Sequence, residues 1–344
     1  MIILMGIILF LLSSAGVYFY RDYAIRYQLL DIPNERSMHQ TTIPRGAGIV
    51  FVLLWSFSLL FLKLQHYLSL QDLLLLLPAG CLVSILGFVD DRDSLSAVKR
   101  LIIQCVVAGL FIAILGHCSA LRLWGDTPVY LGLLAPAMVL FLLVWSINAY
   151  NFMDGLDGIS GIEAMSVFGM GTWLFWDQGV RGLALASGAL VCVVSGFLLW
   201  NWPKAKVFMG DAGSYCLGFA VAAFALIGDQ RYGISMMPWL ILYGVFCFDA
   251  SATLLRRLLK GETLSAAHSL HAYQRLHHAG FSTVHILLGL GVVNAVLAGI
   301  VYSITRYPGL GLLGFLLALF IVASLYVWVE KINPMWSIVK SGSE

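Results

Sequence analysis

The sequence LGLLAPAMVLFLLVWSI (131–147) runs directly into NAYNFMDGLDGISG (148–161). Its first part carries no charge and is close to the length of a membrane-spanning helix. Its second part holds two Asn, two Asp and three Gly. Because carboxylates beside so much apolar sequence are costly to bury, acids in this position are candidates for function. The stretch therefore predicts a helical membrane protein with a polar site at the end of a span.

Four oxygen-bearing side chains of this stretch, Asn148, Asn151, Asp154 and Asp157, recur every three residues. On one straight helix this spacing drifts by about 60° per step, which spreads the four over about half of the circumference. The glycines between them instead predict that the helix ends here and that the backbone opens into a polar loop. Such a set of oxygens suits a hard cation or a phosphate-bearing ligand, and a plain polar turn is the alternative.

The composition excludes a soluble globular protein, because 60% of the 344 residues are hydrophobic and 11% are charged. Long continuous apolar runs predict an all-α polytopic membrane protein, with a single domain over residues 1–344. We expect 10 or 11 transmembrane helices. The expected spans lie near residues 2–20, 46–64, 72–89, 101–116, 131–147, 162–176, 182–200, 213–228, 235–254, 284–304 and 310–329.

The Lys and Arg residues predict the orientation of these spans. One set of loops holds five of the 20: Lys63, Arg122, Arg181, Arg231 and Arg306. The other 15 belong to the opposite set, which the positive-inside rule places in the cytoplasm, with the N-terminus outside. The first span has no small-residue cleavage signal, so we interpret it as a retained span rather than a signal peptide. The six Cys show no CxxC spacing and are interpreted as small hydrophobic residues.

A second acidic segment is GFVDDRDSLSAVKR (87–100). Asp90 and Asp91 are adjacent, so on a helix they point about 100° apart and cannot face the same way. One would then face a cavity while the other binds a metal or a helix terminus; helix capping or solvation is the alternative. Ser94 or Asp93 is a candidate N-cap of the following helix. Lys99 is a candidate phosphate ligand or an interface anchor.

Two more segments add a metal candidate and cations. In NWPKAKVFMGDAGSYCLGF (201–219), Asp211 is flanked by glycines before an apolar helix, which suits either an N-cap or a metal ligand. Lys204 and Lys206 lie nearby, as phosphate ligands or as interface anchors. In the first basic loop, Arg36, His39 and Arg45 are candidate phosphate ligands among prolines that favour an extended chain.

The last large loop is rich in His and Arg. It offers His268, His271 and Arg275, a set that suits binding of a sugar diphosphate better than a zinc site, since no Cys accompanies it. Asp249 lies within the preceding span, and Arg256, seven residues later, shares its helix face. An ion pair between Asp249 and Arg256 with a purely structural role is the alternative to a functional role.

These segments share a chemistry. Their metal-ligand candidates are oxygens, which favours magnesium, or manganese, over zinc or copper. The chemistry that follows is transfer at a diphosphate bond, and a site at the membrane implies that one substrate is a lipid. No Walker A motif appears, which argues against an ATP-driven pump. We expect no nucleic-acid partner, and a homodimer is compatible with the sequence.

The ordered motifs PNERSMH, IPRGAG, GFVDDRDSLSAVKR, NAYNFMDGLDGISG and FMGDAGS, followed by the His loop, resemble the polyprenyl-phosphate N-acetylaminosugar-1-phosphate transferases. The resemblance covers nearly the whole chain. It implies magnesium dependence, a cytoplasmic site in a bacterial inner membrane, and transfer of a sugar-1-phosphate from a UDP-N-acetylaminosugar to undecaprenyl phosphate, with release of UMP.

The resemblance also implies roles for single residues. Asp90 matches the acid proposed to deprotonate the lipid phosphate, with Asp91 beside it. Asp154 and Asp157 match the acids of the central motif, and Asp211 matches the main metal ligand, with Asp154 as a second candidate. Asn148 and Asn151 belong to the nucleotide and metal neighbourhood. Direct attack of the lipid phosphate is favoured over a covalent aspartyl intermediate.

One departure bears on the donor. Muramoyl-pentapeptide transferases carry three consecutive His in the last large loop, whereas this loop reads HSLHAYQRLHH (268–278), closer to relatives that build O-antigen or similar polysaccharides. That favours a smaller UDP-N-acetylaminosugar, with pentapeptide transfer in peptidoglycan synthesis as the alternative. A secondary transporter of an anionic sugar nucleotide is the alternative from another class, and it predicts charges near the bilayer midplane and matched repeat halves.

Overall fold

The computed structural model describes residues 2–33, 41–123, 127–264, 266 and 268–336, and these form a helical bundle with two small hairpins. The helices are α1 (Ile2–Arg26), α2 (Gly48–Leu64), α3 (Leu70–Asp93), α4 (Ala97–Leu115), α5 (Leu134–Met153), α6 (Ile159–Asp177), α7 (Arg181–Asn201), α8 (Asp211–Tyr232), α9 (Met237–Leu242), α10 (Gly244–Leu259), α11 (Ala272–His278), α12 (Thr283–Arg306), the 3₁₀ turn η1 (Pro308–Leu310) and α13 (Gly311–Ile332). The antiparallel hairpins pair β1 (Leu30–Asp31) with β2 (Ile43–Pro44) and β3 (Ala120–Leu121) with β4 (Val129–Tyr130).

The chain is a multi-pass membrane protein. Eight described helices are long and apolar enough to cross a membrane, and α2 is a shorter apolar helix. Ten of the eleven spans expected from the sequence fall on one helix each, which confirms the all-α class. The expected span 235–254 is divided, because α9 ends at Leu242 and α10 begins at Gly244.

The helix boundary in the decisive stretch differs from the prediction. α5 continues to Met153, so Asn148 and Asn151 lie on the helix and the polar loop begins at Asp154. The reason is that the Asn148 amide has partners within the bundle: it donates to the Val144 carbonyl one turn earlier at 2.7 Å and to Gln104 Oε1 of α4 at 2.6 Å. A paired amide can stay in a buried helix, so the helix does not have to end before it.

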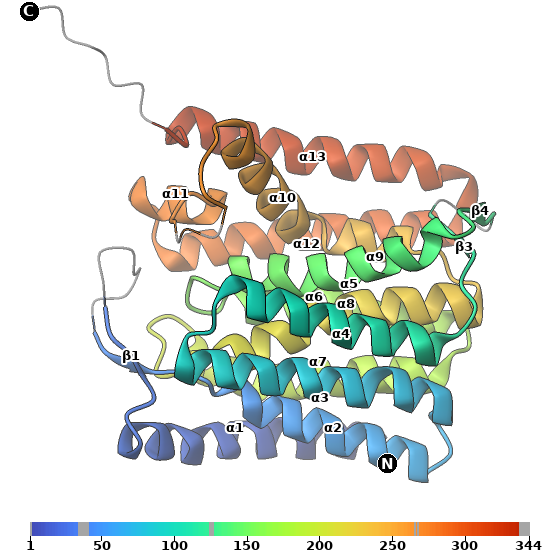
Figure 1. The fold of residues 1–344 in the computed structure, drawn as a ribbon, viewed down its shortest axis with the longest axis horizontal. Coiled ribbons are helices and arrows are strands. Elements are labelled where there is room, and N and C mark those ends of the chain that lie inside the picture. The colour runs from blue at the N-terminus through green and yellow to red at the C-terminus, as the bar shows by residue number, and fades with distance from the viewer. Residues whose placement is uncertain (1, 34–40, 124–126, 265, 267, 337–344) are drawn as a thin grey trace, which may run out of the picture.

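The long helices lie side by side (Figure 1). The β1–β2 hairpin and α11 lie at one end of the bundle, here called the site end, and the β3–β4 hairpin lies at the other, the opposite end. α8 runs through the middle of the bundle. Of its most apolar 18-residue stretch, 94% is buried inside the protein, against 17% for the corresponding stretch of α1. It packs against α3, α5 and α2 and is therefore the helix around which the others are placed.

Small residues bring the other helices close to α8. A Cβ added at Gly218 would lie 2.5 Å from the Ser146 carbonyl oxygen of α5, and one at Gly48 of α2 would meet the backbone of Gly213. Lipid is as apolar as a side chain, so membrane helices gain from close van der Waals packing rather than from hydrophobic burial. These glycines allow that packing.

An ionic network closes the opposite end, where the sequence suggested little chemistry. Arg231 Nε donates to Asp72 of α3 at 2.6 Å, and the backbone N–H of Arg122, beside β3, donates to the fully buried Asp229 at 2.9 Å. The network joins the last turn of α8 to its neighbours and has a structural role.

We predict that Gly218→Val lowers the stability of the bundle by about 1–3 kcal/mol, because the added side chain overpacks the contact between α5 and α8. Gly109→Val on α4 is the matched control, since nothing lies within 4 Å of its added Cβ. Thermal unfolding in detergent compares the two. Equal midpoints would show that the close approach of α5 and α8 is not needed.

Candidate functional site

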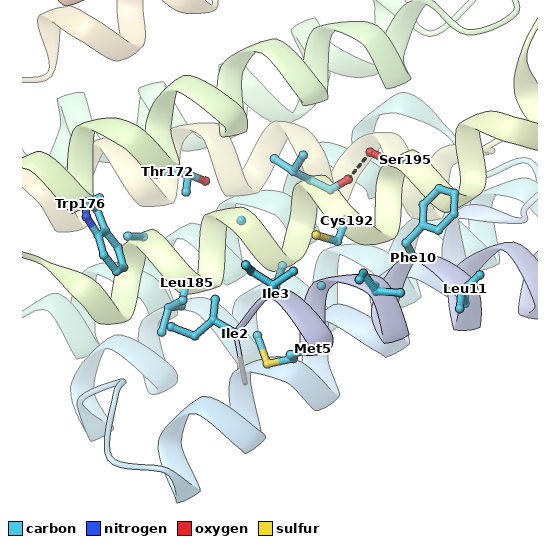
Figure 2. A pocket seen from close by; sticks show the side chains of 16 residues that line it. Ile2, Ile3, Met5, Phe10, Leu11, Thr172, Trp176, Leu185, Cys192 and Ser195 are labelled. Carbon is cyan, nitrogen blue, oxygen red and sulfur yellow. Dashed lines mark hydrogen bonds between the residues drawn. The ribbon is translucent and has the colours of Figure 1, made fainter.

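One cavity among the described residues is apolar. It has a volume of about 730 Å³, lies between α1, α6 and α7, and has no charged residue in its lining (Figure 2). Ile2, Ile3 and Leu185 face it, and the Ser195 hydroxyl is already bonded to the Val191 carbonyl at 2.7 Å. Such a hollow offers contact for hydrocarbon but no group for catalysis.

A second cavity, here called the polar cavity, has a volume of about 650 Å³ and lies at the site end. It gathers segments that are far apart in the sequence. Its lining consists of Asp31, Thr41, Ile43, Arg45, Asn151, Asp154, Gly155, Leu156, Asp157, Asn201, Lys204, Ala205, Phe208, Met209, Gly210, Asp211, Gln274 and Thr283. Six of the residues singled out from the sequence therefore meet here: Arg45, Asn151, Asp154, Asp157, Lys204 and Asp211.

Asp91 lies behind the wall of this cavity and binds the first turn of α8. Its carboxylate accepts the backbone N–H groups of Asp211 at 3.0 Å and Ala212 at 3.4 Å, and its side chain is 6% exposed. Arg45 donates to the same carboxylate, through Nε at 3.0 Å and through Nη2. An anion is stabilised at a helix N-terminus by the free N–H groups and the helix dipole. Of the two partners expected for one of the adjacent acids, a metal or a helix terminus, Asp91 has the helix terminus. The expectation that the other acid faces a cavity is not met for the polar cavity, since neither Asp90 nor Asp91 lines it.

Two glycines let the backbone come this close to Asp91. Gly46 has a φ of +89° and Gly210 a φ of +74°, values that other residues rarely adopt. A Cβ on Gly210 would collide with Asp91 Oδ2 and with the backbone of Gly46. Asp211 follows as the first residue of α8, with Gly210 as the N-cap, so Asp211 does not cap the helix with its side chain.

Asp90 has a different set of main partners, although its side chain also lies within hydrogen-bond reach of the Asp211 side chain. Its carboxylate accepts Arg100 Nη1 at 3.0 Å, the Tyr215 hydroxyl at 2.9 Å and the backbone N–H of Leu95 at 2.8 Å. It is buried and does not line the polar cavity. The role of Asp90 as a base stays a prediction.

The segment after the acidic pair differs from the sequence expectation. Ser94 ends α3 in the left-handed region, with a φ of +47°, and Ser96 is the N-cap of α4, so the capping prediction for Ser94 and Asp93 is wrong. Lys99 is exposed, whereas its neighbour Arg100 turns inward to Asp90. Arg100 was not among the residues predicted from the sequence. Arg100 follows Lys99 by one residue and therefore points about 100° away on the helix. This spacing was the sequence feature that could have indicated an inward-facing cation.

Asn151 connects α5 to the start of α8. Its amide donates to Asp211 Oδ1 at 2.9 Å and to the Ser214 hydroxyl at 3.0 Å. Both amide hydrogens are thereby used, which fixes the orientation of the Asp211 carboxylate in the cavity wall. Asn148 bonds to α4 instead and does not line the cavity. Its predicted contact with substrate stays a prediction.

The 154–158 segment forms another wall and is held by a residue that the sequence analysis did not single out. Asn201 Oδ1 accepts the Gly158 N–H at 2.9 Å, and Asn201 Nδ2 donates to the Val207 carbonyl at 3.0 Å. Asp157 accepts the Ala205 N–H at 2.9 Å. Burial raises the pKa of the Asp154 carboxyl from its ordinary 3.8 to about 7. Only the tertiary structure places Asn201 between the two loops.

The His loop contributes less to the cavity than its composition suggests. His271 is buried, with Nδ1 3.4 Å from Asp249 Oδ1, and Asp249 also accepts the Ala272 N–H at 2.8 Å. Burial, with help from His271, lowers the pKa of His268 to about 4, so that ring is neutral at neutral pH. Neither ring lines the polar cavity; Gln274 of the same loop does.

Two arginines of this region pair with α13. Arg275 is buried and bonds to Glu330 at 2.5 Å and to the Asn333 carbonyl at 3.1 Å. Arg256 bonds to Glu330 at 2.6 and 2.8 Å, so the predicted ion pair with Asp249 is wrong. Seven residues separate Arg256 from Asp249 by about 10 Å along the helix, whereas Glu330 lies alongside. Substrate contacts of His268, His271 and Arg275 stay predictions, and Arg36 and His39 lie outside the described residues.

The donor set of the polar cavity fits a hard cation. Among the described residues, no three His, Cys, Asp or Glu side chains converge as a ready metal cage. Magnesium does not need one, because it is usually held by one or two carboxylates, water and substrate phosphates. Asp211 and Asp154 supply carboxylate oxygens on the cavity wall, and its lining contains neither Cys nor His.

Comparisons with known proteins agree with this picture. The family model described as glycosyl transferase family 4 matches residues 73–229. The undecaprenyl-phosphate alpha-N-acetylglucosaminyl 1-phosphate transferase of Yersinia pestis is 30% identical over 97% of this chain and 92% of its own. The enzyme of the same name from Escherichia coli K12 is 31% identical over 85% of this chain and 81% of its own. A probable undecaprenyl-phosphate N-acetylglucosaminyl 1-phosphate transferase of Bacillus subtilis is 28% identical over 92% of this chain and 87% of its own.

We predict that Gly210→Ala abolishes activity, whereas Gly280→Ala, in the turn after α11, does not. Both positions have a positive φ that other residues rarely adopt, so both variants lose about 1–3 kcal/mol to backbone strain. Only the Cβ at 210 also strikes Asp91, since nothing lies within 4 Å of a Cβ at 280. Measuring sugar-1-phosphate transfer and thermal unfolding for both separates the two effects. Comparable activity in both variants would contradict the importance of the Asp91 contact.

Proposed function

The chain belongs to glycosyl transferase family 4, and from this we propose that it transfers an N-acetylaminosugar-1-phosphate from a UDP-sugar to undecaprenyl phosphate. One observation carries the proposal: four carboxylates and two cations line one cavity at one end of a membrane helix bundle, namely Asp31, Asp154, Asp157, Asp211, Arg45 and Lys204. The names of the relatives support undecaprenyl phosphate as the acceptor. We expect UMP to be the second product.

The lining of the polar cavity suggests how a UDP-sugar would bind. Arg45 and Lys204 can bond to the diphosphate, and charge-assisted hydrogen bonds of this kind are the strong ones. Ile43, Leu156 and Phe208 form an apolar part of the wall that suits a nucleobase. Magnesium, or manganese, would be held by Asp211 and Asp154 and would offset charge on the phosphoryl oxygens.

A groove next to the polar cavity suits the isoprenoid chain of the acceptor. It has a volume of about 310 Å³ and lies between α10, α11, α12 and α13, with a lining that is largely apolar. Met153 and Ile159, the residues that flank the 154–158 segment, belong to this lining. A lipid chain in the groove would therefore bring its phosphate to the wall that carries Asp154.

The reaction that this arrangement favours is a direct displacement. An oxygen of the lipid phosphate bonds to the β-phosphorus, the bond from that phosphorus to the bridging oxygen breaks, and UMP leaves with the electron pair. Because the second pKa of a phosphate monoester is about 6, most of the acceptor is already ionised at neutral pH. Positioning and charge neutralisation would then matter more than removal of a proton by Asp90, and a covalent aspartyl intermediate is not required.

The setting of the reaction is also a proposal. The distribution of Lys and Arg supports a cytoplasmic site in the bacterial inner membrane. The departure in the His loop supports a small UDP-N-acetylaminosugar and an O-antigen-type polysaccharide over the pentapeptide donor. A homodimer stays a prediction.

We predict that Asp211→Asn and Asp90→Asn each reduce UMP release to background and leave the protein folded. Asp211 loses a charge on the cavity wall, and Asp90 loses the charge that binds Arg100. Asp93→Asn is the control, because Asp93 is exposed beside Arg92. The assay uses purified protein, undecaprenyl phosphate, magnesium and a panel of UDP-N-acetylaminosugars, so it also identifies the donor. Near-normal turnover in both variants would sink the assignment.

A pair of lysines tests where the donor binds. Lys204 lines the polar cavity, whereas Lys206 lies over the Trp200 ring at 5.2 Å. We predict that Lys204→Gln raises the KM for the UDP-sugar about tenfold, the effect of losing roughly 1.4 kcal/mol of binding energy. Lys206→Gln should leave that KM unchanged. The same KM in both variants would place the diphosphate elsewhere.

A further inference from the structure

A buried acid lies inside the bundle and does not line the polar cavity. Glu163 of α6 has no exposed surface, and its Oε2 accepts a hydrogen bond of 2.8 Å from Nδ2 of Asn294 on α12, which is 2% exposed. Both residues fall within the expected spans 162–176 and 284–304. An ionisable side chain at such a place is costly and is a candidate for function.

The groups around Glu163 cannot balance a negative charge. No Lys, Arg or His of the described chain forms an ion pair with it. The nearby Tyr150 and Tyr243 hydroxyls already donate to the Ser160 and Ser146 carbonyls, at 2.7 and 3.2 Å. A carboxylate would therefore keep a single hydrogen-bond donor, which is unfavourable in an apolar interior.

Two unpaired atoms indicate how the charge is removed. In the described part of the chain, Glu163 Oε1 and Asn294 Oδ1 are both buried and both without a hydrogen-bond partner. Two acceptor oxygens cannot bond to each other unless a hydrogen lies between them. A single proton on the carboxyl group supplies that hydrogen. If the O and N atoms of the Asn294 amide are exchanged, one contact between two acceptor oxygens still remains, so one proton on Glu163 is still needed.

We propose that Glu163 is protonated and forms a neutral, doubly hydrogen-bonded pair with Asn294, which positions the cavity walls carried by α6 and α12. In this pair Nδ2 donates to Oε2, and the acid O–H donates to Oδ1. An acid and an amide are both planar, so the two bonds close a ring and leave no oxygen of the pair without a partner.

The pair lies close to the walls of the polar cavity. α6 begins directly after the 154–158 segment, and Glu163 is five residues from Gly158, about 7 Å along the helix. α12 begins at Thr283, which lines the cavity, and Leu287 of α12 lies against Gly158. α6 and α12 pack against each other along this line. Glu163 and Asn294 are therefore positioning residues. Their effect on turnover rests on the proposed function, whereas the protonation of Glu163 does not.

Glu163→Gln is the decisive variant, because an amide reproduces the neutral ring: it donates to Oδ1 and accepts from Nδ2. We expect wild-type unfolding midpoint, kcat and KM. Glu163→Leu and Asn294→Leu each leave the other polar group buried and unpaired, so both should lower the unfolding midpoint and kcat/KM. The double Leu variant should recover stability over either single one, since no unpaired group remains. Thr172→Val, which removes a hydroxyl bonded to the Phe168 carbonyl of the same helix, is the control on α6.

Infrared spectroscopy reads the proton directly and needs neither substrate nor turnover. The difference spectrum of wild type minus Glu163→Gln should contain the carbonyl stretch of a protonated carboxylic acid. Absence of that band, or a loss of activity in Glu163→Gln as large as in Glu163→Leu, would overturn the proposal. If the Leu variants fail to fold, the activity of Glu163→Gln and the infrared band still test whether Glu163 is protonated. If the band is present but no variant or wild-type protein transfers a sugar phosphate, the proposed function fails and the neutral pair stands.

Discussion

The carboxylate of Asp91 accepts hydrogen bonds from the first N–H groups of α8 and from Arg45, and the site is built around this contact. α8 is the central helix of the bundle, so the point at which it begins sets the position of Asp211. Arg45 in turn belongs to the segment after β2, which reaches the 202–210 segment through the bond from the Phe208 N–H to the Pro44 carbonyl at 2.8 Å. One buried acid thus aligns three segments. Gly210 is required because a Cβ there would strike Asp91, and a Cβ at Gly46 would strike the Tyr20 hydroxyl.

The acids of this chain fall into groups that differ in their surroundings. Asp91, Asp90 and Asp229 are buried and paired, each with an arginine and with backbone N–H groups or hydroxyls, so they hold elements together. Asp154 and Asp211 face the polar cavity and keep oxygens available to a ligand. Glu163 belongs to neither group, because it is buried without a cation. A membrane interior leaves an acid these options: an ion pair, a wet cavity or a proton.

The bundle also separates its two kinds of cavity by position. The apolar hollow between α1, α6 and α7 offers only contact with hydrocarbon, whereas the polar cavity gathers charge at the site end. The apolar groove between α10 and α13 lies next to the polar cavity. A lipid acceptor and a water-soluble donor need such a junction, because their reacting phosphates must meet although the rest of each molecule belongs in a different solvent.

The sequence by itself determined the all-α membrane class, the positions of the helices and the gathering of the acidic segments at one end. These follow from apolar runs and charge spacing, which are local properties of the chain. It also predicted that one of two adjacent acids binds a metal or a helix terminus, because residues 100° apart on a helix cannot point the same way. Only the tertiary structure decided that Asp91, rather than Asp90, does so, that Arg100 rather than Lys99 turns inward, and that Arg256 pairs with Glu330. These choices depend on which helices become neighbours, and the packing of α8 against α3 and α5, together with that of α10 against α13, sets this. Spacing within a single segment does not contain that information.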